Sequence, residues 1–120
     1  MATHNELGFK GEQIAKDYLL KKGYEILDEN WTHGKAEIDL IAYLNRQIVF
    51  VEVKTRSSTA FGMPEDFVST AKQKLMENAA NEYIEVMNHM GEVRFDIIAV
   101  LFNQHKKYTL NHIEDAFWPS

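Results

Sequence analysis

Residues 36–56, AEIDLIAYLNRQIVFVEVKTR, are the stretch that decides the fold of this chain. Two runs of alternating apolar residues flank a short polar turn at Asn45-Arg46, and this pattern predicts a β-hairpin. Counting outward from the turn places Asp39 opposite Glu52. Opposed residues of an antiparallel pair point to the same face, with Cβ atoms about 5 Å apart. Lys54, two residues beyond Glu52, then projects from that face about 7 Å away.

The predicted hairpin has one hydrophobic face and one charged face. The hydrophobic face comprises Ile38, Leu40, Ala42, Val49, Val51 and Val53. The charged face carries Asp39, Glu52, Lys54 and also Glu37, which the same count places opposite Lys54. Like charges in opposed positions destabilise a sheet, and a buried carboxylate is costly unless it is paired or binds a metal. Either a divalent cation offsets this cost, or the hairpin lies at the surface with a cross-strand salt bridge. For Glu37 we expect a pairing with Lys54 or a place at the sheet edge, with an auxiliary ligand as the alternative.

The charged face suggests metal-assisted chemistry on a phosphate. Asp39 and Glu52 are suited to share one Mg²⁺ or Mn²⁺, because such hard ions use few carboxylates and leave positions for water and phosphate. Lys54 can then stabilise charge that develops at phosphorus or lower the pKa of a water molecule on the ion. Glu12 is a candidate for a further carboxylate, since it lies at the margin of the core-facing stripe of the first predicted helix. Otherwise Glu12 is a solvated helix residue.

Composition bounds the class of protein. The chain has 120 residues, 45% hydrophobic and 26% charged, and these values predict one globular domain over residues 1–120. It has no cysteine, and no apolar run approaches a membrane span, so we expect a cytoplasmic protein without membrane contact. The net charge of −5 argues against broad, charge-driven affinity for nucleic acid.

Hydrophobic periodicity predicts an α/β fold of the order αβββαββ, a central mixed sheet with a helix on each face. The helices are expected over about 5–22 and 69–90, and the strands over about 23–31, 36–44, 47–56, 93–102 and within 106–117. The apolar stripe of the second helix is predicted to be Ala71, Leu75, Met76, Ala79, Tyr83, Val86 and Met87. The irregular segment 57–67 carries Phe61, Met63 and Phe67, which we expect to pack on the core rather than stack on a base.

Four motifs in fixed order strongly resemble the uncharacterised YraN-like bacterial family. They are GFKGEQIAKDYLLKKGYEILDENW (8–31), AEIDLIA (36–42), VFVEVKTR (49–56) and RFDIIAV (94–100). That family is similar to the PD-(D/E)XK, restriction-endonuclease-like superfamily and, within it, to archaeal Holliday junction resolvases. The resemblance covers nearly the whole chain. It implies a restriction-endonuclease-like fold, in which a central mixed β-sheet is flanked by helices, and phosphodiester hydrolysis with a divalent metal.

The resemblance also implies roles for particular residues. The superfamily's helix glutamate falls on Glu12 and its metal-binding aspartate on Asp39. The glutamate and lysine of its E-x-K element fall on Glu52 and Lys54. All four are therefore expected to be catalytic, with Asp39, Glu52 and Glu12 holding Mg²⁺ or Mn²⁺.

Two departures from the family pattern bear on nucleic-acid contact. The family usually has glycine where this chain has Ala36, and it often has arginine where this chain has Thr32, which weakens the case for phosphate contact on that strand. Arg56 and Lys72 are the candidate nucleic-acid-binding residues. Arginine is suited to bidentate phosphate contact, although a solvated position is the alternative for both side chains.

The leading functional expectation is a metal-dependent endonuclease acting on DNA, and the resemblance points to branched, Holliday-junction-like DNA. DNA is preferred over RNA as the partner, and resolvases of this type act as homodimers. The alternatives are a non-catalytic nucleic-acid-binding module on a nuclease scaffold, or a nuclease subunit whose protein partner supplies the basic surface.

Overall fold

The computed structural model describes residues 4–57, 68–105 and 107–118. Its elements are α1 (His4–Lys21), β1 (Glu25–His33), β2 (Ala36–Leu44), β3 (Gln47–Arg56), α2 (Thr70–Val86), β4 (Glu92–Phe102) and β5 (Tyr108–Ile113). The predicted order αβββαββ is confirmed. The loop aromatics Phe61 and Phe67, with Met63, lie outside the described residues, so their packing stays a prediction.

The five strands form one open mixed sheet in the order β1-β2-β3-β4-β5. β3 and β4 are parallel, with α2 in the connection between them, and the other neighbouring pairs are antiparallel. This α/β arrangement is consistent with a restriction-endonuclease-like fold. The predicted hairpin register is confirmed, since Leu40 pairs with Val51 and Leu44 with Gln47. Asn45 and Arg46 both have positive φ, 52° and 66°, as a two-residue type I′ turn requires.

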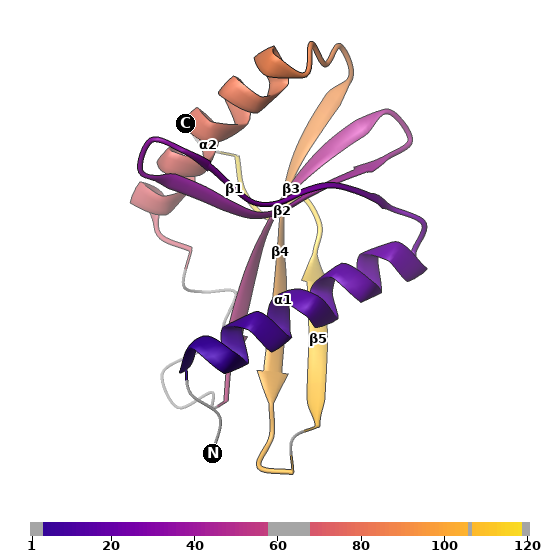
Figure 1. The fold of residues 1–120 in the computed structure, drawn as a ribbon, viewed down its shortest axis with the longest axis vertical. Helices are drawn as coiled ribbons and strands as arrows, with labels where there is room; N and C mark the ends of the chain where they lie inside the picture. Colours follow the sequence, from indigo (N-terminus) through magenta and orange to yellow (C-terminus); the bar gives the residue numbers. More distant parts are fainter. Residues whose placement is uncertain (1–3, 58–67, 106, 119–120) are drawn as a thin grey trace.

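The two helices cover opposite faces of the sheet (Figure 1). The core under α1 contains Ala15, Leu19, Tyr24, Leu40, Ala42, Val49, Val51, Ile98, Val100 and Phe102. The core under α2 contains Ala36, Ile38, Ile41, Ile48, Phe50, Met76, Ala79, Ala80, Tyr83 and Phe95. Each strand of the hairpin is therefore buried on both sides. The expectation of one hydrophobic and one charged face is wrong along most of its length, because α2 covers the second face.

The predicted stripe of α2 is correct in its middle and wrong at its ends. Met76, Ala79 and Tyr83 are buried as predicted, and Ala80 is buried beside them. The predicted stripe residues Ala71, Leu75, Val86 and Met87 are exposed. The helix begins after the N-cap Ser69, whose side chain accepts from the backbone N–H of Lys72, and it ends at Val86. Its two ends thus extend past the part of the sheet that it covers.

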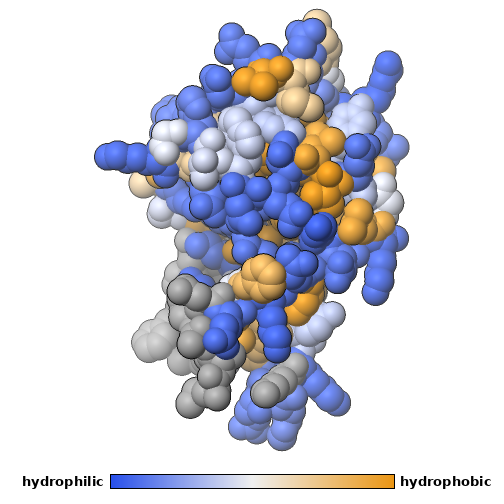
Figure 2. All heavy atoms as spheres, viewed as in Figure 1, coloured by the Kyte–Doolittle hydropathy of each residue, from blue (hydrophilic) through white to orange (hydrophobic). Residues whose placement is uncertain are grey.

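On the face that Figure 2 shows, hydrophilic side chains predominate and hydrophobic ones form a few small groups. Neither helix of the described part of the chain is long and apolar enough to cross a membrane.

Candidate functional site

The strands β2 and β3 separate at Asp39, and this opening creates the site. Leu40 with Val51 is the outermost pair of the ladder on this side, so Asp39 and Glu52 are not ladder partners, nor are Glu37 and Lys54. The predicted opposition of these side chains is wrong in that respect. Asp39 Oδ2 instead accepts the backbone N–H of Val53 at 2.7 Å, in place of a backbone acceptor from β2.

The backbone of β2 rotates at the same point. Ile38 packs under α2, whereas Leu40, two residues later, packs under α1. In a regular strand residues two apart share a face, so the rotation frees Asp39 to leave the sheet surface. Asp39 therefore lies where the two strands part.

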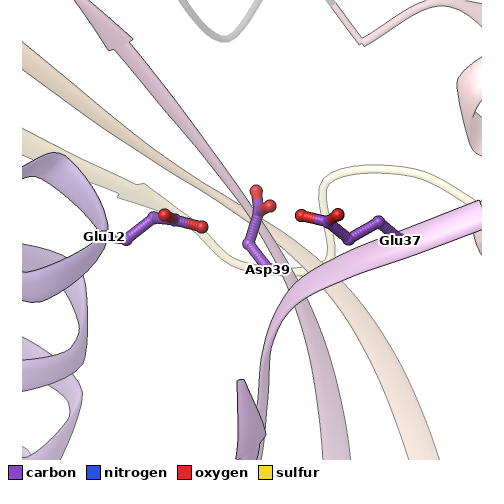
Figure 3. Close-up of side chains that lie close together, drawn as sticks. All are labelled: Glu12, Glu37 and Asp39. Atoms are coloured by element: carbon purple, nitrogen blue, oxygen red, sulfur yellow. The ribbon is translucent and has the colours of Figure 1, made fainter. Parts of the chain in front are cut away.

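Three carboxylates converge at this opening. Glu12, Glu37 and Asp39 each offer an oxygen within 4.8 Å of the others (Figure 3). Glu12 reaches in from α1 and Glu37 from the other side, with Asp39 between them. Asn30 on β1, oriented with its amide nitrogen toward the cluster, donates to Glu12 Oε1 at 2.9 Å and to Glu37 Oε1 at 3.3 Å. Glu37 is thus part of the cluster, and among the described residues it forms no ion pair with Lys54.

Glu52 approaches the cluster from the α2 side of the sheet. Its side chain is 4% exposed, and its Oε2 lies 3.2 Å from Lys72 Nζ. This oxygen has no hydrogen-bond partner among the described residues. Lys72, the candidate for nucleic-acid contact on α2, therefore has an internal partner in this structure. Its contact with nucleic acid stays a prediction.

Burial, together with the neighbouring acidic groups, raises the pKa of two of these groups. Burial, the neighbouring Glu52 carboxylate and the charge of Glu12 raise the pKa of Asp39 to about 9, although the Val53 N–H acts in the opposite direction. Burial and the charges of Glu37, Glu52 and Glu29 also raise the pKa of Glu12, against a hydrogen bond with Asp39. Without a cation Asp39 therefore retains its proton near neutral pH.

These groups line one cleft of about 480 Å³ between α1 and the end of β3. Its walls are Gly8, Phe9, Glu12, Glu37, Asp39, Glu52, Val53, Lys54, Thr55 and Arg56. The four residues that the resemblance marks as catalytic are thus brought together, and Arg56 lies beside them with its Nη1 donating to the carbonyl of Thr55 at 2.8 Å. Lys72 is not part of the lining.

The close approach of α1 depends on Gly11. A Cβ at this position would collide with the Thr55 hydroxyl on β3. Glu12 follows Gly11 directly in the sequence. The close contact between the α1 backbone at Gly11 and β3 therefore sets how far Glu12 lies from the cluster.

The donor set fits a hard divalent cation. Mg²⁺ binds oxygen ligands at about 2.0–2.1 Å, so two ligand oxygens lie at most about 4.2 Å apart, close to the spread of the three carboxylates. The buried Glu52, whose Oε2 pairs with Lys72 Nζ and accepts no hydrogen bond from the described residues, offers a further oxygen in the same cleft. A cation would also offset the effect of burial and of the acidic neighbours on the pKa of Asp39.

Two neighbours of the cluster, Asn30 and Phe9, escaped the sequence analysis, and membership of Glu37 was only the alternative there. Asn30 has φ +49°, a conformation that asparagine tolerates, and no periodic pattern marks it. Phe9 lies one turn before Glu12, so helical spacing from Glu12 could have found it. Glu37 was considered chiefly as a partner of Lys54, because the regular ladder was assumed to continue past Asp39.

A second group of ionisable side chains lies elsewhere, around Asp96 of β4. Asp96 is 0% exposed and receives hydrogen bonds from Arg94, whose Nε and Nη2 lie 2.8 and 2.7 Å away. His112 Nε2 lies 2.7 Å from Asp96 Oδ2, the oxygen that Arg94 Nη2 also contacts, and His112 Nδ1 is 3.0 Å from Tyr18 Oη on α1. Through Asp96, His112 and Tyr18 this group ties β4, β5 and α1 together.

Comparison with known proteins identifies the relatives of this chain. The model of the uncharacterised protein family UPF0102 matches residues 11–100. The chain is 52% identical to a UPF0102 protein of Flavobacterium psychrophilum over 98% of both chains. It is 48% identical to one of Alkaliphilus oremlandii, over 95% of this chain and 99% of the other, and 42% identical to one of Phocaeicola vulgatus, over 99% and 98%. The YraN-like resemblance is thereby confirmed, and the chain belongs to the UPF0102 family.

Proposed function

We propose that this protein is a divalent-metal-dependent endonuclease that hydrolyses phosphodiester bonds in DNA. One observation carries the proposal. Glu12, Asp39, Glu52 and Lys54 come from a helix and two strands, yet they line one open cleft. They are also the positions that the PD-(D/E)XK resemblance marks as catalytic.

In this proposal Glu12, Glu37 and Asp39 hold Mg²⁺ or Mn²⁺, with Glu52 supplying a further oxygen. The ion would supply Lewis-acid polarisation of the phosphate and a more acidic water. Asn30 orients Glu12 and Glu37 by donating to both, and the Val53 N–H fixes Asp39. Such outer contacts hold ligands in place for binding.

Lys54 and Arg56 are the basic groups of the cleft. Lys54 projects from β3 beside the carboxylates, where its ammonium stabilises the charge that develops on the phosphate oxygens. Arg56 presents a guanidinium suited to a neighbouring phosphate. Four carboxylic acids against two basic side chains leave the cleft acidic, so a bound cation is needed before a phosphodiester can approach.

Branched DNA is the proposed substrate class, following the likeness to Holliday junction resolvases. A homodimer would place two clefts on the two strands to be cut. A protein partner that adds basic surface is compatible with the net charge of −5.

The test is cleavage of a labelled four-way junction, a duplex and a single strand, in Mn²⁺ or Mg²⁺ at low salt. Wild type should cut, whereas Asp39→Asn and Lys54→Ala should lose at least about a hundredfold in rate and keep their circular dichroism spectra. Asp17→Asn, at an exposed position of α1, is the matched control and should cut like wild type. Cutting by Asp39→Asn at the wild-type rate would refute the assignment.

A non-catalytic nucleic-acid-binding module is the second candidate, and the Lys72–Glu52 ion pair favours it. Lys72 Nζ already neutralises Glu52 without a metal. Titration calorimetry with Mn²⁺ separates the two functions. Binding in wild type that is lost in Asp39→Asn supports the nuclease, whereas nucleic-acid binding without Mn²⁺ binding supports the module.

A further inference from the structure

We propose that Phe9 is a base-stacking residue, and that the cleft therefore takes a nucleic-acid strand whose base next to the bound phosphate is unpaired. The inference rests on the proposed function and narrows its substrate. It concerns one wall of the cleft, formed by the first turns of α1.

Phe9 is exposed at the edge of the cleft and does not belong to the core. Its side chain is 64% exposed, whereas Ala15 and Leu19 on the same helix are fully buried. Phe9 is also absent from the partly buried residues that pack on the core under α1, which include Leu7 and Ile14. The fold therefore gains little from this ring.

The position of Phe9 relative to the carboxylates suits a nucleotide. Phe9 precedes Glu12 by three residues, so the two side chains are neighbours on the helix surface, and both line the cleft. At Gly8, beside it, no atom of the described residues lies within 4 Å of the place where a Cβ would lie. The helix surface next to the ring is thus open, and a flat base can approach it while its phosphate lies near Lys54 or Arg56.

Charge cannot supply the affinity of this cleft by itself. The lining has more carboxylic acids than basic groups, and the whole chain carries −5. Proteins that hold single strands gain affinity from aromatic rings, because every base has a face that can stack. Phe9 is the aromatic side chain in the described lining of the cleft. A base within a continuous duplex has both faces covered by its neighbours, so stacking on Phe9 selects a strand with an unpaired base.

The experiment measures binding separately from cleavage. Fluorescence anisotropy with a labelled single strand and the matching duplex, in Ca²⁺, compares wild type with Phe9→Ala, Phe9→Trp and Leu20→Ala, and gels confirm that the strands stay intact. Leu20→Ala is the matched control, because it removes another exposed apolar side chain of α1 (46% exposed) that does not line the cleft.

We expect Phe9→Ala to weaken single-strand binding roughly tenfold and to leave the weaker duplex binding unchanged. Leu20→Ala should bind like wild type. Phe9→Trp should retain affinity and show quenching of indole fluorescence on binding, beyond that of wild type, which reports the stack directly.

Equal affinities of wild type and Phe9→Ala for the single strand would overturn the inference, as would equal losses for single strand and duplex. The nuclease proposal survives either result if wild type still cuts DNA and Asp39→Asn does not. Absence of both nucleic-acid binding and cleavage in wild type would remove the proposed function, and this inference with it.

Discussion

The Asp39 carboxyl is mostly buried and has acidic neighbours, and this gives the metal-free protein a specific pH dependence. Its pKa of about 9 in the folded state lies above its ordinary value of 3.8. A group whose pKa is raised on folding stabilises the fold fully at low pH, and that stability is lost as the pH rises through the folded pKa. We therefore expect the stability of the metal-free protein to fall between about pH 4 and pH 9.

Asp39→Asn should remove most of that fall. The amide oxygen can still accept the Val53 N–H, while the charge is gone, so at pH 8 the variant should be more stable by at least about 1 kcal/mol, or a few degrees in Tm. Thermal unfolding of wild type and variant at pH 5 to 9 measures this difference in stability. Mn²⁺ should raise the Tm of wild type and not that of the variant. A variant with the same pH slope as wild type would contradict the assigned origin of the shift.

The contribution of Lys72 to stability can be tested by substituting this residue. Lys72→Ala leaves the Glu52 carboxylate buried without its cation, so we expect a loss of about 1–3 kcal/mol in the free energy of unfolding by urea. Lys74→Ala, which removes the more exposed partner of Glu77, should cost less than about 1 kcal/mol. Adding Glu52→Gln to Lys72→Ala should recover part of the loss, and no recovery would count against the pairing.

At the scale of elements, the contact of α1 with β3 is the feature that places Glu12. Gly11→Ala should destabilise the protein by about 1–3 kcal/mol, because the new methyl group meets Thr55 and pushes the helix away. Gly8→Ala is the matched control. The new Cβ at position 8 has no atom of the described residues within 4 Å. Gly8→Ala should therefore stabilise the helix by up to about 1 kcal/mol.

Chemical denaturation of the two glycine variants checks this expectation. Gly11→Ala should also weaken Mn²⁺ binding, because Glu12 would move with the helix. Thr55→Ala should partly restore the stability of Gly11→Ala, since it removes the hydroxyl and methyl groups that collide. A Gly11→Ala protein as stable as Gly8→Ala would show that the helix is free to shift.

At the scale of the whole molecule, the buried Asp96 links elements that are distant in the sequence. Burial alone would raise its pKa, but hydrogen bonds from His112, Arg94 and the Asp115 N–H hold the pKa of Asp96 below its ordinary value. A group whose pKa is lowered on folding stabilises the protein at pH values above its unfolded pKa. That stability is lost as the pH falls through its folded pKa. This contribution should therefore disappear only below about pH 4.

Removing that carboxylate should be the most damaging of these changes. Asp96→Ala leaves the partly buried Arg94 without its main partner and the buried hydrogen-bond group around it unsatisfied, so we expect a loss of about 3 kcal/mol in the free energy of unfolding. Glu114→Gln removes an exposed partner of the same arginine. It should change the free energy of unfolding by less than about 1 kcal/mol. Urea unfolding at neutral pH measures both, and similar losses would contradict the central place of Asp96.

The sequence by itself determined the hairpin, its register and the order of the elements. These depend on local facts: the two residues at the turn adopt positive φ, and apolar alternation on either side fixes which residues pair. It also determined which residues gather, since Asp39, Glu52 and Lys54 lie close together along the hairpin and the family motif adds Glu12.

The tertiary structure alone decided how those side chains are partnered. Where β2 leaves β3, the ladder ends and Asp39 binds the Val53 N–H, so the pairing expected from a continuous hairpin fails. The burial of the second face, the pairing of Glu52 with Lys72 and the inclusion of Glu37 follow from where the helices pack. The reason is physical: periodicity specifies a face within one element, whereas the separation of strands and the seating of helices are set by packing between elements.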